Sequence, residues 1–192
     1  IKRFTFSRIR QVDIVIFDTT NSDIVGTVIP NGLSVEIFET RPVKINLNIL
    51  TFAKFILSLE SFSIKSIFRT KKGILYQIYF QLLIIYIKAD LTIRKPKAVI
   101  TYIDNCNKFA WLSGNLENIP CIAIQNGFRL SYNADLDHAY YCNHLFCFGN
   151  REREVYPKLN YKVDHFYPFG SLSLNNNFCS DLNQIKPIYD LF

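Results

Sequence analysis

Short apolar runs rich in β-branched residues alternate along the chain with segments of helical spacing. Most runs are continuously apolar, a pattern typical of strands that are buried on both faces of a parallel sheet. Polar or glycine-bearing segments follow most of them, which indicates that each strand ends at a loop. The predicted strands are residues 13–17, 33–38, 43–47, 98–103, 121–125, 145–148 and 163–167.

Helices are predicted between these strands from apolar spacing and capping residues. Ser22 or Asp23 is the expected cap of a short helix that runs to Val28, and the Pro-Asn-Gly turn after it stops the helix. Thr51 and Asn150 are the expected caps of the helices predicted at 51–60 and 150–159. The remaining predicted helical segments are 51–60, the apolar run 74–87 with a stop at Pro96, 106–116 and 150–159.

The repeated order of strand, helix and strand predicts a doubly wound, Rossmann-like α/β domain with a mostly parallel sheet. We expect this domain over residues 1–171, followed by a polar, asparagine-rich linker at 172–192. The chain has no methionine, even at position 1, and it ends on the start of an apolar run. We therefore expect a piece of a longer protein that has a carboxyl-terminal domain.

The apolar run 74–87 has two interpretations. It is shorter than the roughly 20 apolar residues that span a bilayer, so a buried crossover helix is the favoured one. A helix lying in a membrane interface is the alternative, because the preceding segment carries Lys65, Arg69, Lys71 and Lys72. Peripheral contact with the inner membrane is therefore kept as an expectation.

The net charge of +6 suits an anionic small ligand or an anionic membrane surface. No arginine-rich arm or nucleic-acid motif is present, so nucleic acid is not an expected partner. The five cysteines are odd in number and form no CxxC pair, and no secretory signal is visible. These features indicate a reduced, cytoplasmic location.

The sequence contains none of the glycine-rich, nucleophile-elbow or zinc-protease motifs GxGxxG, Walker, GxSxG and HExxH. A group of metal-binding residue types between positions 137 and 147 does not follow a regular zinc spacing, so we expect no metal and no organic cofactor. The members of this group are Asp137, His138, Cys142, His144 and Cys147.

Polar residues follow three of the predicted strands and are the candidate site residues. Ligands of open α/β sheets bind beyond the carboxyl ends of the strands, so we expect the three strand ends to face one cleft. Catalytic roles are predicted for Asp104 and Asp18, either of which could take a proton from an attacking hydroxyl. The predicted ligand-binding residues are Thr20, Asn21, Asn105, Gln125, Asn126, Gly127 and Arg129.

Each of these segments also has a structural interpretation. The residues after the first strand are common in turns and helix caps, and Asp104 could cap the helix that begins near Cys106. Gly127 is expected to adopt a positive φ and bring backbone N–H groups to a ligand, and Arg129 to bind phosphate in a bidentate manner. A plain Asn-Gly turn with a solvated arginine is the alternative.

Five segments in a fixed order resemble a bacterial surface carbohydrate biosynthesis family that includes lipopolysaccharide and capsule enzymes. They are FDTTNSDIV, KPKAVITYIDNCNKFAWLS, IPCIAIQNGFR, LFCFGNRE and FYPFGSL. The resemblance implies the amino-terminal half of a two-domain glycosyltransferase of the GT-B type. It implies that this half shapes the acceptor side, with a glycan acceptor and a nucleotide-sugar donor as partners. The donor would be held by the carboxyl-terminal domain.

Asn126 departs from the pattern of the more distant polymerase relatives, which often have a histidine before the glycine of this loop. Asparagine does not act as a general base near neutral pH. The base is then Asp104 or Asp18, or it is absent and this half only binds. A non-catalytic α/β module that binds a small ligand is the alternative function, and a truncated, inactive remnant is a third.

Overall fold

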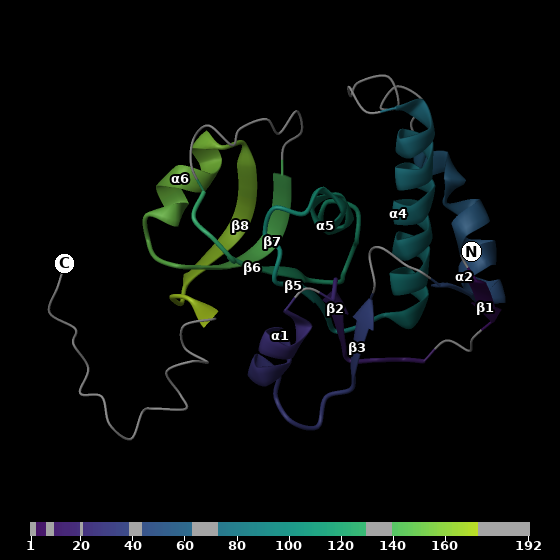
Figure 1. Cartoon of the computed structure of the whole chain (residues 1–192), viewed down its shortest axis with the longest axis horizontal. Helices are drawn as coiled ribbons and strands as arrows, with labels where there is room; N and C mark the ends of the chain where they lie inside the picture. The colour runs from purple at the N-terminus through teal and green to yellow at the C-terminus, as the bar shows by residue number, and fades with distance from the viewer. Residues whose placement is uncertain are drawn as a thin grey trace, which may run out of the picture.

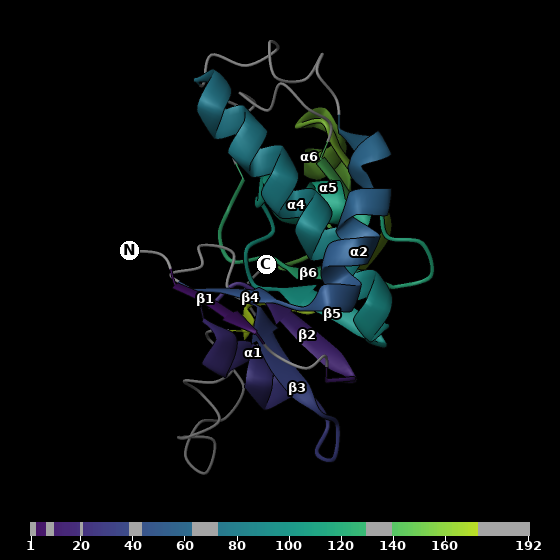
Figure 2. The same ribbon diagram turned by 90° about the vertical axis from the view of Figure 1, so that its right-hand side faces the viewer.

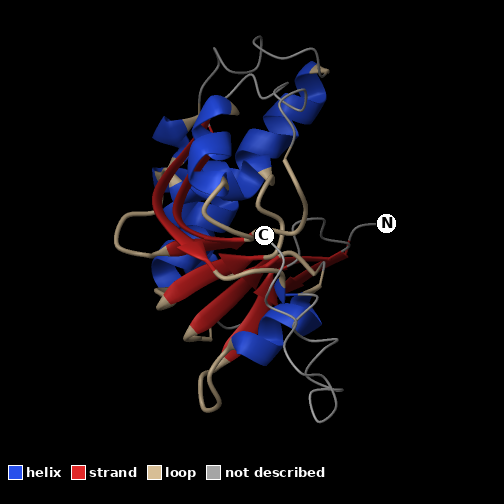
Figure 3. Cartoon of the chain, turned by 90° about the vertical axis from the view of Figure 1, so that its left-hand side faces the viewer, coloured by secondary structure: helices blue, strands red, loops and turns tan. Residues whose placement is uncertain are grey.

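The computed structural model describes residues 3–6, 10–19, 21–38, 44–62, 73–129 and 140–172. Its centre is a six-stranded sheet of order β3-β2-β5-β6-β7-β8, in which every neighbouring pair is parallel (Figure 1). Helices pack on both faces, so the predicted doubly wound, Rossmann-like fold class is confirmed (Figure 3). The strands are β2 (Ile14–Phe17), β3 (Val35–Phe38), β5 (Ala98–Thr101), β6 (Cys121–Ile124), β7 (Tyr140–Cys147) and β8 (Tyr161–Pro168).

The two faces of the sheet have separate cores. Helix α1 (Ser22–Val28) covers one face, where Val25 packs against alternate residues of β2 and β5. The opposite face is covered by the remaining helices, which share a larger core with the sheet (Figure 2). These are α2 (Ile49–Leu57), α4 (Ile74–Arg94), α5 (Asn107–Ser113) and α6 (Glu152–Lys158), with a short 3-10 turn at Leu59–Ser61 after α2.

Strand β7 begins five residues earlier than the apolar run 145–148 predicts. Its first half contains polar Asn143, whose side chain has a structural use: Oδ1 accepts from the backbone N–H of Cys121 at 3.1 Å. The same oxygen accepts from the hydroxyl of Ser113 at 3.3 Å. The polar Asn143 side chain interrupts the apolar run, so the hydrophobic pattern did not predict this half of β7.

A second, two-stranded sheet pairs β1 (Arg3–Phe6) with β4 (Lys44–Leu47) in parallel. The predicted strand at 43–47 is thus present, but it does not join the main sheet. The pattern analysis missed β1, because its four residues alternate between polar and apolar and lie in a basic segment.

Three predicted helix caps are wrong. Asn21, not Ser22 or Asp23, occupies the cap position of α1, and Arg151 rather than Asn150 precedes α6. Helix α2 is capped by Asn48, whose side-chain oxygen accepts from Leu50 N at 2.8 Å. Thr51 is instead buried inside that helix and binds a side chain of α4.

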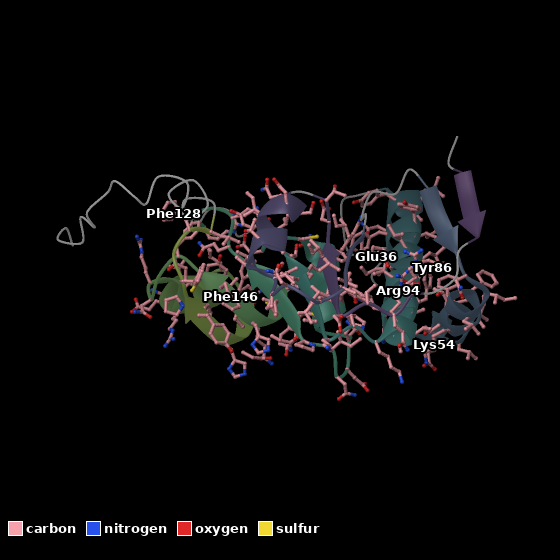
Figure 4. All side chains as sticks on the ribbon, turned by 90° about the horizontal axis from the view of Figure 1, so that it is seen from below. Glu36, Lys54, Tyr86, Arg94, Phe128 and Phe146 are labelled. Atoms are coloured by element: carbon pink, nitrogen blue, oxygen red, sulfur yellow. The ribbon has the colours of Figure 1, made fainter. Side chains whose placement is uncertain are left out.

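A buried ionic cluster ties the end of α4 to α2 and β3 (Figure 4). The guanidinium of Arg94 donates from Nε to Asp90 at 2.5 Å and from Nη1 to Glu36 at 2.5 Å. The hydroxyl of Thr51 donates to the other Asp90 oxygen at 3.0 Å. Asp90 and Arg94 are both buried and are paired with each other. Through Thr51 and Glu36 this buried pair links α4 to α2 and to β3.

Two buried thiols between β6 and β7 give the fold a measurable pH dependence. Burial raises the pKa of both Cys121 and Cys142 from 9.0 to about 12. A group whose pKa is raised on folding stabilises the fold below its unfolded pKa, and that stability is lost as pH rises towards the folded pKa. We therefore expect the free energy of unfolding to fall between about pH 8.5 and pH 10.5, by on the order of 2 kcal/mol per thiol, and the urea midpoint to fall with it.

The control is the double variant Cys121→Ala, Cys142→Ala, which should show a flatter pH profile over the same range because it has lost both thiols. A wild-type midpoint that does not change up to about pH 10.5 would contradict the prediction.

Candidate functional site

The carboxyl ends of β2, β5 and β6 lie side by side along one edge of the sheet, as predicted. Ile14 is paired with Ala98, and Val99 with Cys121, in parallel register. The chain proceeds from β2 to β3 on one side, and later to β5 on the other side of β2. The gap between β2 and β5 is therefore a topological switch point, the position at which open α/β sheets bind ligands.

The ends of β2 and β5 are joined at this switch point by Thr101. Its hydroxyl donates to the carbonyl of Phe17 at 3.1 Å and accepts from the backbone N–H of Ile103 at 3.1 Å. Thr101 is fully buried and was not among the predicted site residues. The sequence signal that could have identified it is a threonine at the end of an otherwise aliphatic strand.

Asp18 follows β2 directly and is held in an unusual backbone conformation. Its φ is 85°, its side chain is buried, and its N–H donates to the carbonyl of Phe38 at 2.9 Å. A positive φ is uncommon for residues other than glycine and occurs most often for Asn and Asp. The charge of Asp18 also acts across the switch point, since burial raises the pKa of the Cys106 thiol and Asp18 raises it further.

The neighbouring polar residues face water. Asn21 is exposed in the left-handed region, with φ 54° and ψ 32°, and its carbonyl rather than its side chain accepts from α1, at Val25 N. Asn105 is exposed between Asp104 and Cys106, the residue that occupies the cap position of α5. Thr20 lies outside the described residues.

The Asp104 carboxylate is fully buried beyond β5 and is the centre of a hydrogen-bond network. Oδ1 accepts from the N–H of Asn126 at 3.2 Å and from Nη2 of Arg129. Oδ2 accepts from Nε of Arg129 at 3.0 Å and from the hydroxyl of Tyr156, on α6, at 2.6 Å. We call Asp104, Asn126, Arg129 and Tyr156 the Asp104 network.

Electrostatics keeps every donor of this network in its donating form. Burial and the Asp104 charge raise the pKa of Tyr156, so its hydroxyl remains protonated at neutral pH. Burial alone would lower the pKa of the Arg129 guanidinium, but the charge and hydrogen bonds of Asp104 outweigh it and raise that pKa. Tyr161 on β8 is affected similarly, and burial and Asp104 raise its pKa to about 12.

This geometry changes what Asp104 and Arg129 can do. The two oxygens of Asp104 accept four hydrogen bonds, about the capacity of a carboxylate, which leaves little room for a substrate hydroxyl. The bidentate fork of Arg129, predicted to hold phosphate, is occupied by Asp104. Asp104 does not cap α5, so its interpretation as a helix cap is wrong, and its hydrogen bonds give it a role as anchor of the β6 loop. Its catalytic role stays a prediction.

Gln125 and Gly127 are structural parts of the same loop. The Gln125 side chain is buried; its Nε2 donates to the carbonyl of Gly127 at 3.0 Å, and its Oε1 accepts from Phe148 N at 2.9 Å. Gly127 has no positive φ, contrary to the prediction. A Cβ there would meet only Arg129 Nη1 at 3.7 Å, an ordinary contact, so the backbone does not require glycine.

The tyrosine of α6 is the main site residue that sequence reasoning missed. The charged residues at the start of this predicted helix give no local sign of a buried side, yet Glu152 is buried, and Tyr156 lies four residues later on the same side. Phe128, labelled in Figure 4, lies on the outer side of the β6 loop. Its side chain is 76% exposed, and its ring meets that of Phe148 edge-to-face with the ring centroids 5.3 Å apart.

Within the described residues, no group of three or more His, Cys, Asp or Glu side chains is placed to hold a metal ion. The thiols of Cys142 and Cys147 approach backbone carbonyls of His144 and Gly149 instead, while Asp137 and His138 lie outside the described part of the chain. No protein-family model matches the chain, and no curated protein or solved structure is significantly similar to it.

Proposed function

We propose that this chain is the acceptor-side, amino-terminal domain of a GT-B-type glycosyltransferase that acts in bacterial surface polysaccharide biosynthesis. The observation that carries the proposal is the switch point between β2 and β5, with Asp18 on one side and the Asp104 network on the other. The segments that resemble the surface carbohydrate family include both of these strand ends.

In this proposal Asp18 is the general base, because the oxygens of Asp104 are already used by four donors. The Asp18 carboxylate takes the proton of an acceptor hydroxyl, whose oxygen forms a bond to the anomeric carbon of the donor sugar. The bond from that carbon to the nucleoside diphosphate breaks, and the diphosphate leaves with the electron pair. The exposed amides of Asn21, Asn105 and Asn126 then suit the hydroxyl groups of a glycan acceptor.

The donor would be a nucleotide-sugar bound by a further domain, and the reaction would take place on the cytoplasmic side of the membrane. The alternative, a non-catalytic ligand-binding module, is favoured by one observation: Asp104, one of the two predicted catalytic carboxylates, holds the β6 loop through its hydrogen bonds with Arg129 and Tyr156.

The test uses the longest natural protein that contains this chain and measures the release of nucleoside diphosphate from a panel of nucleotide-sugars with surface-glycan acceptors. We expect Asp18→Asn to lower kcat by roughly 10²- to 10⁴-fold, the usual contribution of a general base. Asp23→Asn is the matched control, because Asp23 is an exposed carboxylate in the first turn of α1 and should leave turnover unchanged.

Thermal unfolding of both variants separates chemistry from folding. Turnover by Asp18→Asn equal to that of the wild type would remove Asp18 from the base role. A wild-type protein that binds sugar nucleotide or glycan but never turns over would support the binding module instead.

A further inference from the structure

Helix α2 is apolar on the side that faces water as well as on the side that faces the protein. Of its nine residues only Thr51 and Lys54 are polar, and Thr51 is turned inward. A helix that is apolar all round is normally buried in a protein or a membrane. The side chains of Ile49, Leu50, Phe52, Ile56 and Leu57 are nevertheless 48% to 81% exposed.

Helix α4, which packs against α2, continues this surface (Figure 1). Leu75, Tyr79 and Leu82 are spaced four and three residues apart, so they share one helical face, and all three are exposed, Leu75 by 83%. Ile74 and Tyr76 are also about half exposed. We call the exposed apolar residues of the two helices the α2–α4 surface: Ile49, Leu50, Phe52, Ile56, Leu57, Ile74, Leu75, Tyr76, Tyr79 and Leu82.

The two halves of α4 have different environments. Residues from Ile84 onward are mostly buried against the sheet, and Asp90 and Arg94 belong to the buried ionic cluster. Among the described residues α4 is the one helix long and apolar enough to cross a membrane, but 39% of its most apolar window is buried in the protein. A helix anchored in this way presents its first turns to a partner while its last turns stay in the core.

The sequence between the two helices is mostly positive. Residues 58–73, which join α2 to α4, carry four cations and one anion, Glu60, and Lys54 is the only charged residue of α2. Apolar side chains together with cations are the combination that binds the interface of an anionic bilayer. A protein partner that buried these helices would need acidic groups facing the same cations, whereas anionic headgroups supply negative charge at every position.

We propose that the α2–α4 surface docks onto an anionic lipid bilayer. The exposed leucine, isoleucine and aromatic side chains enter the boundary between headgroups and acyl chains, and the net positive charge of the joining sequence favours anionic headgroups. The domain lies on the membrane and does not span it, because the ionic cluster holds the end of α4 in the protein. This proposal is independent of the glycosyltransferase activity.

The test is co-sedimentation of the chain with vesicles of phosphatidylcholine that contain phosphatidylglycerol, compared with vesicles of phosphatidylcholine alone. We expect binding to the anionic vesicles and weaker binding at about 0.5 M salt, where charges are screened. Leu57→Ser with Leu75→Ser should lower the partition coefficient by at least about tenfold, since both side chains leave the apolar phase. Their exposure of 72% and 83% means that the substitutions spare the core.

The matched control is Val28→Ser with Val35→Ser, two exposed aliphatic residues outside this surface, which should bind as the wild type does. Equal binding to neutral and anionic vesicles, or equal loss in the control, would overturn the proposal. So would a chain that ignores both kinds of vesicle and forms a dimer that Leu57→Ser with Leu75→Ser dissociates, because the surface would then pair two copies.

Discussion

Replacing Asp104 with alanine is expected to lower the free energy of unfolding by about 3–5 kcal/mol, the usual cost of removing one partner of a buried ion pair. The variant leaves the mostly buried guanidinium of Arg129 without its counter-charge and the buried hydroxyl of Tyr156 without an acceptor. It also releases the N–H of Asn126. Urea unfolding followed by circular dichroism at neutral pH measures the change.

Asp164→Ala is the matched control for this effect. Asp164 is an exposed carboxylate that accepts from a tyrosine hydroxyl, that of Tyr141, at 2.5 Å, so its loss should cost less than about 1 kcal/mol. Adding Arg129→Met to Asp104→Ala should restore part of the stability, because the unpaired cation is removed as well. If Asp104→Ala unfolded at the same urea concentration as the wild type, the carboxylate would not be the anchor of the β6 loop.

The positions of the strand ends were easier to predict than the hydrogen bonds that Asp104 makes there. Apolar runs indicate buried parallel strands, and parallel strands place their carboxyl ends on one edge, so the position of Asp18, Asp104 and the β6 loop followed from pattern alone. The contacts did not follow, because Tyr156 reaches Asp104 from 52 residues away. A pairing over that distance has no local signal in one sequence.

Local rules failed where tertiary contacts supplied a different partner. Thr51 is a good helix cap, but its hydroxyl is used by Asp90, and Asn48 caps α2 instead. Gly127 follows an asparagine as in a tight turn, but Gln125 closes the loop by a side-chain hydrogen bond without any positive φ. The helical period of α2 and α4 was readable, whereas their outward apolar faces required the structure.

The second large effect is expected at Arg94, whose removal should cost about 3–5 kcal/mol. In Arg94→Met the methylenes of the side chain are largely retained, but Asp90 stays buried with only Thr51 as partner and Glu36 loses its ion pair. The end of α4 would then be less firmly held to both α2 and β3. The urea midpoint at neutral pH reports the loss.

Lys97→Met is the matched control, because Lys97 also pairs with a carboxylate, Asp13, at 2.8 Å but is 69% exposed. Exposed pairs contribute about 0–1 kcal/mol, so this variant should be close to the wild type. Adding Asp90→Asn to Arg94→Met should recover part of the stability by removing the unpaired buried charge. Equal midpoints for Arg94→Met and Lys97→Met would mean that the cluster does not hold α4, and the anchored geometry of the α2–α4 surface would lose its basis.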